Sequence, residues 1–267
     1  MNTIALIAGD ELRYWRRSKV AWTVLIILLL VSTCAAFVSN AEVSLRAEER
    51  LAQQAEADAI FQEQPDRHPH RMVHYGHYVY RTASPLAVID SGIDSMVGTS
   101  IFLEGHRQNS ATFAAAKETG LLARFGSFSP AFVLQSLAPL LLILCGFACV
   151  GREKENKTLY QLIGQGVSSN SILLGKSAAL LMVALMALLP LILLGFFATG
   201  SDTFDFRQSL FVIVLGYFCY LAFWVFLIVS VSALLKTSTQ SLSVLLGFWI
   251  IAVVLMPRLA GAYASTS

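Results

Sequence analysis

The chain has 267 residues, of which 56% are apolar and 13% are charged. This composition excludes an ordinary soluble globular domain and is typical of a protein that crosses a membrane several times. The formal net charge of +2 says little by itself, and we expect no nucleic-acid partner.

The first 19 residues predict an amphipathic helix on the inner surface of the membrane. At about 100° per residue, one side of this helix collects the apolar side chains Ile4, Ile7, Ala8, Leu12 and Trp15. Three arginines fall largely opposite, and Glu11 lands on the apolar side. Two interpretations of Glu11 stay open: a frayed or snorkelling carboxylate, or a salt-bridge partner of another subunit.

Five long apolar runs follow, and their interiors contain no Asp, Glu, Lys, Arg or His. The runs are Val20–Val38, Ala131–Val150, Ile172–Ala198, Leu210–Leu235 and Leu242–Met256. Four of them reach the roughly 20 residues that a membrane-spanning helix needs, and the uncharged residues 237–240 can lengthen the fifth. The predicted fold is therefore an all-α polytopic membrane protein. Because ionisable groups inside a membrane usually mark ion or proton paths, any transport must be driven from elsewhere.

Basic residues before the first run and between the second and third predict a cytoplasmic N-terminus. We expect this order of segments: an interface helix at 1–19, spans at 20–38, 130–150, 172–198, 210–235 and 242–257, a periplasmic segment at 39–129, a cytoplasmic loop at 151–171, a short periplasmic loop at 199–209, a cytoplasmic turn at 236–241 and a periplasmic tail at 258–267. The odd number of spans leads us to expect that a sixth helix is missing, and the tail is too short to form structure of its own.

The exported segment begins without Pro or Gly, so the first helix should continue to Gln64. Its small-residue stripe suits packing on a neighbouring helix: Val43, Ala47, Leu51, Ala55 and Ala59. Pro65–Ser129 predicts irregular structure with short helices and a helical stretch near Ala111–Arg124. Pro130 then opens the second span, where Pro139 is tolerated if neighbouring groups satisfy the freed carbonyl.

All five histidines lie in the exported segment. Clustered imidazoles suggest a zinc or copper site, but no cysteine accompanies them and the spacing lacks a helical pair followed by a third ligand. Polar packing in an exported subdomain is the commoner explanation. We therefore expect no metal and no other cofactor, and keep as weak candidate ligands His68, His70, His74 and His77.

Catalytic motifs are lacking, because the sequence contains no nucleophile elbow, HExxH, CxxC or intramembrane carboxylate pair. Gly175-Lys176-Ser177 looks like the end of a phosphate-binding loop, but Asn170 stands where its first glycine should be. We interpret Lys176 as an interfacial anchor. We expect no catalytic residue and no ATP binding by this chain.

The loop Gly151–Ser171 is the most informative polar stretch. It alternates charge directly after the second span, and an amphipathic piece follows at Leu159–Ile163. The simplest interpretation is a solvated loop that obeys the positive-inside rule. Its two glutamates are not needed for that rule, so a docking surface for a soluble partner fits better.

The pattern of this loop resembles the permease subunits of type-2 ABC exporters. The matching residues are an E-x-E pair at Glu153 and Glu155, then Thr158-Leu159, then Ile172–Lys176. The exported motifs resemble a subgroup with a large periplasmic insertion, similar to nitrous-oxide-reductase maturation and gliding-motility permeases. These exported motif residues are His74, His77, Pro85, Asp90, Glu104, His106 and Asn109.

The resemblance implies a permease dimer in membrane lipid, a homodimer or a heterodimer with a paralogue, in which each copy binds an ATP-binding cassette subunit. ATP hydrolysis would take place on that partner. The implied docking residues are Glu153, Glu155, Thr158, Leu159 and Lys176. The alternatives are a membrane-anchored periplasmic sensor or scaffold, and a metal-handling module built on the histidines.

Overall fold

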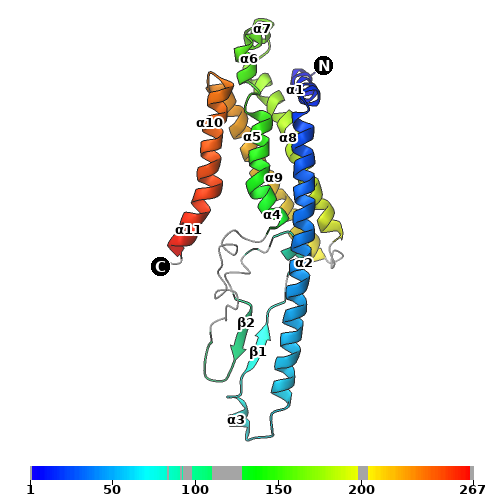
Figure 1. Cartoon of the computed structure of the whole chain (residues 1–267), viewed down its shortest axis with the longest axis vertical. Coiled ribbons are helices and arrows are strands. Elements are labelled where there is room, and N and C mark those ends of the chain that lie inside the picture. The colour runs from blue at the N-terminus through cyan, green and yellow to red at the C-terminus, as the bar shows by residue number, and fades with distance from the viewer. Residues whose placement is uncertain are drawn as a thin grey trace.

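The computed structural model describes residues 2–82, 84–90, 92, 98–109, 128–197 and 204–264. It is an elongated helical bundle with a long projection at one end (Figure 1). The projection is the outer half of α2 (Val20–Gln62), with β1 (His77–Tyr80) and β2 (Ser100–Leu103) beside it. Helices α1 (Thr3–Ser18), α6 (Gly151–Glu155) and α7 (Thr158–Gly164) lie at the opposite end.

Helix α1 has the amphipathic character that its sequence predicts. The side chain of Asn2 accepts a hydrogen bond from the backbone N–H of Ile4 and caps the helix. Ala8, Glu11 and Trp15 are buried, whereas the three arginines are exposed. The helix ends at Lys19, whose φ of 60° turns the chain into α2.

Helix α2 continues beyond the first apolar run as one helix, which runs for 43 residues from Val20. Leu51, Ala55 and Ala59 of the small-residue stripe are exposed. Helix α2 instead meets β1 through Gln54 and Asp58, so the stripe does not make the contact that holds the strands.

The predicted spans are confirmed as helices, and in the part of the chain that the structure describes five helices are long and apolar enough to cross a membrane. The second span begins at Pro130, with Ser129 as its cap. Its pieces and those of the later spans are α4 (Pro130–Phe132), η4 (Val133–Leu137), α5 (Ala138–Gly146), α8 (Ser169–Phe197), α9 (Phe204–Leu234), α10 (Ser238–Trp249), η5 (Ile250–Leu255) and α11 (Met256–Ala264). The expectation of an unstructured tail is wrong up to Ala264, because the last helix continues that far.

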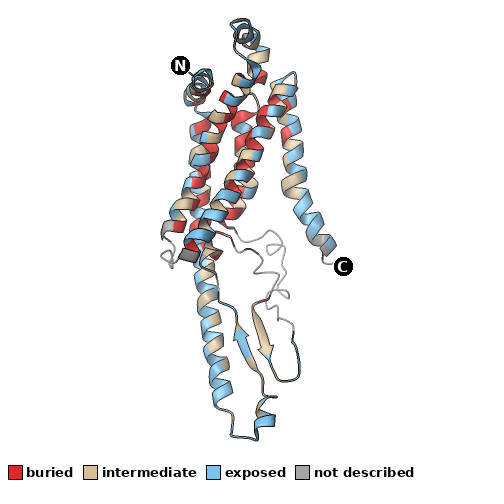
Figure 2. Ribbon diagram, turned by 180° about the vertical axis from the view of Figure 1, so that it is seen from behind, coloured by how far each residue is buried: buried red, intermediate tan, exposed pale blue. Residues whose placement is uncertain are grey.

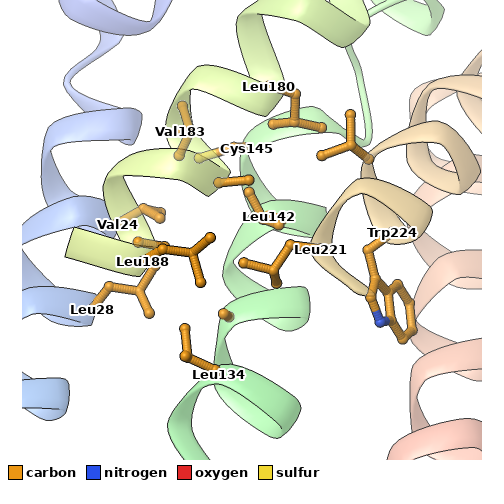
Figure 3. Packing of buried hydrophobic residues seen from close by; sticks show 14 of the residues in the cluster. Val24, Leu28, Leu134, Leu142, Cys145, Leu180, Val183, Leu188, Leu221 and Trp224 are labelled. Atoms are coloured by element: carbon orange, nitrogen blue, oxygen red, sulfur yellow. The ribbon is translucent and has the colours of Figure 1, made fainter. Parts of the chain in front are cut away.

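The core lies between α2, η4, α5, α8 and α9 (Figure 3). Its small side chains, among them Ala179 and Ala184, are fully buried, as expected where helices approach closely without a hydrophobic driving force. Figure 2 shows that burial is concentrated in this bundle, while the α2 projection and the α10–α11 arm are largely exposed. Exposed apolar side chains on the spans suit contact with lipid.

The segment between the first two spans contains a feature that the sequence did not predict. Strands β1 and β2 pair antiparallel, with His77 opposite Leu103 and Tyr80 opposite Ser100. The edge of β1 is satisfied by Gln54 of α2, which accepts from the backbone N–H of Tyr80 at 2.8 Å and donates to the carbonyl of Tyr78 at 3.1 Å. The predicted helical stretch at 111–124 lies outside the described residues.

Two short helical turns complete the described part of this segment. Helix α3 (Pro69–Met72) precedes β1. The turn η1 (Pro85–Val88) lies against α2 and α9, and the carbonyl of Ile89 accepts from the backbone N–H of Ala131 at 3.1 Å. This second turn therefore connects the segment that carries the strands to the start of the second span.

Candidate functional site around helix α6

Helix α6 follows the second span and is fixed to α9 and α10 at its first residue. The buried hydroxyl of Ser232 accepts from the backbone N–H groups of Val150 and Gly151, both at 3.1 Å. A Cβ atom at Gly151 would lie 2.8 Å from the hydroxyl oxygen of Ser238. Only glycine therefore lets α6 approach the start of α10 this closely.

Arg152 connects α6 to α1. Its guanidinium donates to both carboxylate oxygens of Glu11, at 3.0 and 3.3 Å, and lies 3.4 Å from the centroid of the Tyr14 ring. Glu11 is fully buried in this contact. Both interpretations of Glu11 offered by the sequence are wrong, because its partners belong to the same chain and its carboxylate is not at a frayed end.

Glu153 connects α6 to α8 through Lys176. The ammonium group of Lys176 lies 2.9 Å from Oε1 of Glu153 and 2.5 Å from Oε2 of Glu11. The hydroxyl of Thr158 donates to the other oxygen of Glu153. Because Lys176 is only 2% exposed, its interpretation as an interfacial anchor is wrong. It is the buried centre of a neutral group of two acids and two bases.

The side chains of Lys154 and Glu155 bind the ends of two other helices, α9 and α10. The ammonium group of Lys154 donates to the carbonyls of Ala233 and Leu235, where α9 ends. Glu155 accepts from the backbone N–H of Ser238 at 2.7 Å and from its hydroxyl at 3.1 Å, where α10 begins. Each charge opposes the partial charge of the helix end that it contacts, so both contacts are stabilising.

Four consecutive charged residues of α6 thus bind four different helices. Successive helical residues point about 100° apart, so the run from Arg152 to Glu155 covers the whole circumference of α6. These contacts join α6 to α1, to α8, to the end of α9 and to the start of α10. A displacement of α6 must therefore move or break contacts with all four helices.

Helix α7 carries the exposed apolar side chains at this end of the molecule. Tyr160 is 71% exposed and Ile163 is 46% exposed, whereas Thr158 and Leu159 are half-buried. Figure 1 shows α7 at the tip of the bundle, beyond α6. The implied docking residues therefore do not form one exposed surface. Glu153 and Lys176 are engaged inside the chain, and Glu155 binds α10. On α7, the large apolar side chains that are exposed are Tyr160 and Ile163.

The two residues that resemble the end of a phosphate-binding loop, Gly175 and Lys176, lie inside α8. The contact of α8 with α1 explains why a glycine stands there. A Cβ atom at Gly175 would lie 2.7 Å from Cβ of Ile7 and 3.1 Å from the carbonyl oxygen of Ile4. The glycine is therefore the place where α1 lies against α8.

A cavity of about 810 Å³ lies between η4, α9 and η5, in the half of the bundle that faces the strands. Tyr217 is its polar centre: its hydroxyl donates to Oδ2 of Asp90 at 3.0 Å and accepts from the amide of Gln135 at 2.9 Å. Tyr220 and Trp249 also line the cavity. An aromatic cavity with a few fixed polar groups is typical of a small-molecule binding site.

The second span wraps one side of this cavity and carries Pro139. Proline has no N–H to give to the carbonyl of Gln135 four residues earlier, and the hydroxyl of Tyr220 donates to that oxygen at 2.7 Å. The Tyr220 hydroxyl is therefore the neighbouring group that the sequence analysis required to satisfy the carbonyl freed by a proline inside a span.

The motif residues expected in a periplasmic segment fall into separate places. Asp90 reaches the cavity, and Pro85 starts η1 beside it. The rest surround the strands: His77 pairs with Asp58 at 3.0 Å, and Asn109 donates to Glu104 at 3.2 Å. His74 and His106 lie near each other, with ring centroids 5.4 Å apart.

Sequence reasoning missed Arg152, Lys154 and Ser232 as parts of the α6 site, and Gln135 and Tyr217 as parts of the cavity. The basic residues were attributed to membrane orientation alone. One usable signal was present, since an acidic residue on the apolar side of an amphipathic helix needs a buried cation.

Within the described residues, five helices are long and apolar enough to cross a membrane, as in a multi-pass membrane protein. A family model described as ABC-2 family transporter protein matches residues 5–266. The chain belongs to this family and is a permease subunit of an ABC transporter, a membrane transport component that is not itself catalytic. The family implies a transporter system with an ATP-binding partner. No curated protein and no solved structure matches the chain.

Proposed function

We propose that the chain is the membrane subunit of an ATP-driven exporter, in which α7 receives a cassette ATPase and α6 transmits its movement. The observation that carries this proposal is the set of contacts made by the four charged residues Arg152–Glu155 with four different helices. A contact on α7 is passed through α6 to α1, α8, α9 and α10 together. A solvated loop would need no such connections.

The docking surface in this proposal is the exposed side of α7, centred on Tyr160 and Ile163. Exposed aromatic and aliphatic side chains at the centre of a patch supply most of the binding energy of protein interfaces. Glu153, Glu155 and Lys176 then act behind the interface, by holding α6 against the bundle. Thr158 and Leu159 lie between these two groups.

The proposal also sets the orientation and assembly. The end with α1, α6 and α7 is cytoplasmic, the strands are periplasmic, and the membrane is the bacterial inner membrane. Two permease chains, identical or paralogous, form the translocation path, and the exported segment belongs to the subgroup with a large periplasmic insertion. The cavity around Tyr217 lies in the half of the bundle that faces the strands, and a substrate with aromatic or apolar parts would be held there.

Co-purification tests the docking surface. The full chain is expressed with the cassette ATPase encoded nearest to it, and the double variant Tyr160→Asp, Ile163→Asp is compared with the unchanged chain. We expect the amount of bound ATPase to fall at least about tenfold, because two hot-spot side chains are lost.

The matched control is the double variant Leu45→Asp, Leu51→Asp, which places the same two charges on exposed leucines in the outer half of α2. It should leave ATPase binding unchanged. Equal ATPase binding by the α7 double variant and the unchanged chain would remove α7 as the docking surface.

A further inference from the structure

Three histidines from two separate stretches of the exported segment meet at one point. One ring nitrogen from each of His70, His74 and His106 lies within 4.8 Å of the others. The ring centroids are 5.2 Å apart for His70 and His74, and 5.9 Å apart for His70 and His106. All three rings are exposed.

The backbone brings His106 to the other two through a close approach at Gly105. The backbone N–H of Gly105 donates to the carbonyl of Val73 at 2.8 Å. A Cβ atom at Gly105 would lie 1.8 Å from a methyl carbon of Val73, so another residue would push the two turns apart. His106 itself has a φ of 70°, a conformation uncommon for a histidine.

Further contacts fix both turns. The side chain of His68 accepts from the backbone N–H of His70 and so caps α3, the short helix that carries His70. The side chain of Asn109 donates to the carbonyl of Phe102 at 3.0 Å and to Glu104 at 3.2 Å. The positions of His70 and His106 are therefore set by their own turns and do not depend on contact between the imidazoles.

We propose that His70, His74 and His106 form a binding site for one Zn²⁺ ion. Three imidazole ligands with zinc–nitrogen distances of about 2.1 Å place their nitrogens about 3.4 Å apart in a tetrahedral site. Exposed rings reach this geometry from 4.8 Å by small side-chain rotations. A set of three imidazoles suits zinc rather than calcium or magnesium, which prefer oxygen ligands.

The site differs from the set that the sequence suggested. His77 pairs with Asp58 and packs on Phe61, with the two ring centroids 5.0 Å apart. His68 serves as the cap of α3, and His106 replaces both. The bound ion would clamp the turn after α3 to the turn after β2. This role is independent of the docking of an ATPase on α7.

Zinc binding by the full chain in detergent tests the proposal, with a purification tag that contains no histidine. Equilibrium dialysis against Zn²⁺ should give one ion per chain with a dissociation constant below about 10 µM. The variant His106→Asn should weaken binding at least about tenfold, because asparagine tolerates the positive φ but removes the imidazole. His74→Gln should do the same.

The controls are His68→Asn, which keeps a capping oxygen for α3, and His77→Gln, which keeps a hydrogen-bonding side chain beside Asp58. Both should bind Zn²⁺ as the unchanged chain does. Amide hydrogen exchange provides a second readout, since Zn²⁺ should protect the backbone around Val73 and Gly105 in the unchanged chain but not in His106→Asn. Unaltered affinity in His106→Asn, or equal losses in the two controls, would overturn the proposal.

Discussion

The ammonium group of Lys176 lies 2.5 Å from a carboxylate oxygen of Glu11, a residue 165 positions earlier in the chain. The two side chains are 2% and 0% exposed, and Arg152 and Glu153 complete a group with no net charge. Removing charges from water is costly, and the mutual contacts of the four groups offset that cost. This cluster holds α1 and α6 on α8.

The first prediction concerns the Lys176–Glu11 pair. Lys176→Met should lower the free energy of unfolding by about 3 kcal/mol, because Glu11 stays buried with one cation fewer. Combining it with Glu11→Leu should restore part of that loss. The exposed pair of Glu42 and Arg46 is the control, and Glu42→Gln should cost less than about 0.5 kcal/mol. SDS titration measures the stability of the unchanged full chain and of the three variants, and a double variant less stable than Lys176→Met would contradict the argument.

The second prediction concerns the contact of α1 with α8. Gly175→Ala should destabilise the chain by about 1–3 kcal/mol, because its Cβ would collide with Ile7 and with the backbone at Ile4. Limited proteolysis should then cut α1 earlier. Gly247→Ala is the matched control in a helix with open space around it, and it should be neutral or slightly stabilising. Equal effects of the two substitutions would exclude close packing as the reason for Gly175.

The third prediction concerns Glu155, whose carboxylate accepts hydrogen bonds at the start of α10. Glu155→Ala removes the carboxylate that binds the N–H and hydroxyl of Ser238, at a cost of about 1 kcal/mol. Amide hydrogen exchange should become faster in the first turn of α10 and stay unchanged at its far end. Gln161→Ala, on the exposed side of α7, provides the comparison. No change at Ser238 in Glu155→Ala would show that this contact does not stabilise the helix end.

The fourth prediction concerns the proline of the second span. Tyr220→Phe removes the hydroxyl that donates to the carbonyl of Gln135 and should cost about 1–2 kcal/mol. In a Pro139→Ala background the new backbone N–H can serve that carbonyl, so the same substitution should cost less. Unfolding measurements on the two single variants and the double variant give the coupling. Strictly additive effects would mean that the tyrosine does not replace the missing N–H.

The segment between the first two spans shows where prediction from sequence fails. The helical continuation of α2 was predictable because a run of strong helix formers without Pro or Gly needs no outside partner. The pairing of His77 with Leu103 was not, because two four-residue strands carry little periodicity and their edge is completed by Gln54 of α2. Such short strands are stable only with a third element beside them.

The sequence by itself determined the five spanning helices, the amphipathic α1 and the absence of ionisable groups in the apolar runs. Helices could be predicted because each apolar segment must satisfy its backbone hydrogen bonds internally. Only the tertiary structure decided which charged groups meet. Periodicity placed Glu11 on the apolar side of α1, but it could not identify Lys176 and Arg152 as its partners. Ion pairs between residues far apart in the chain depend on how whole helices pack, and that packing brings α1, α6 and α8 together.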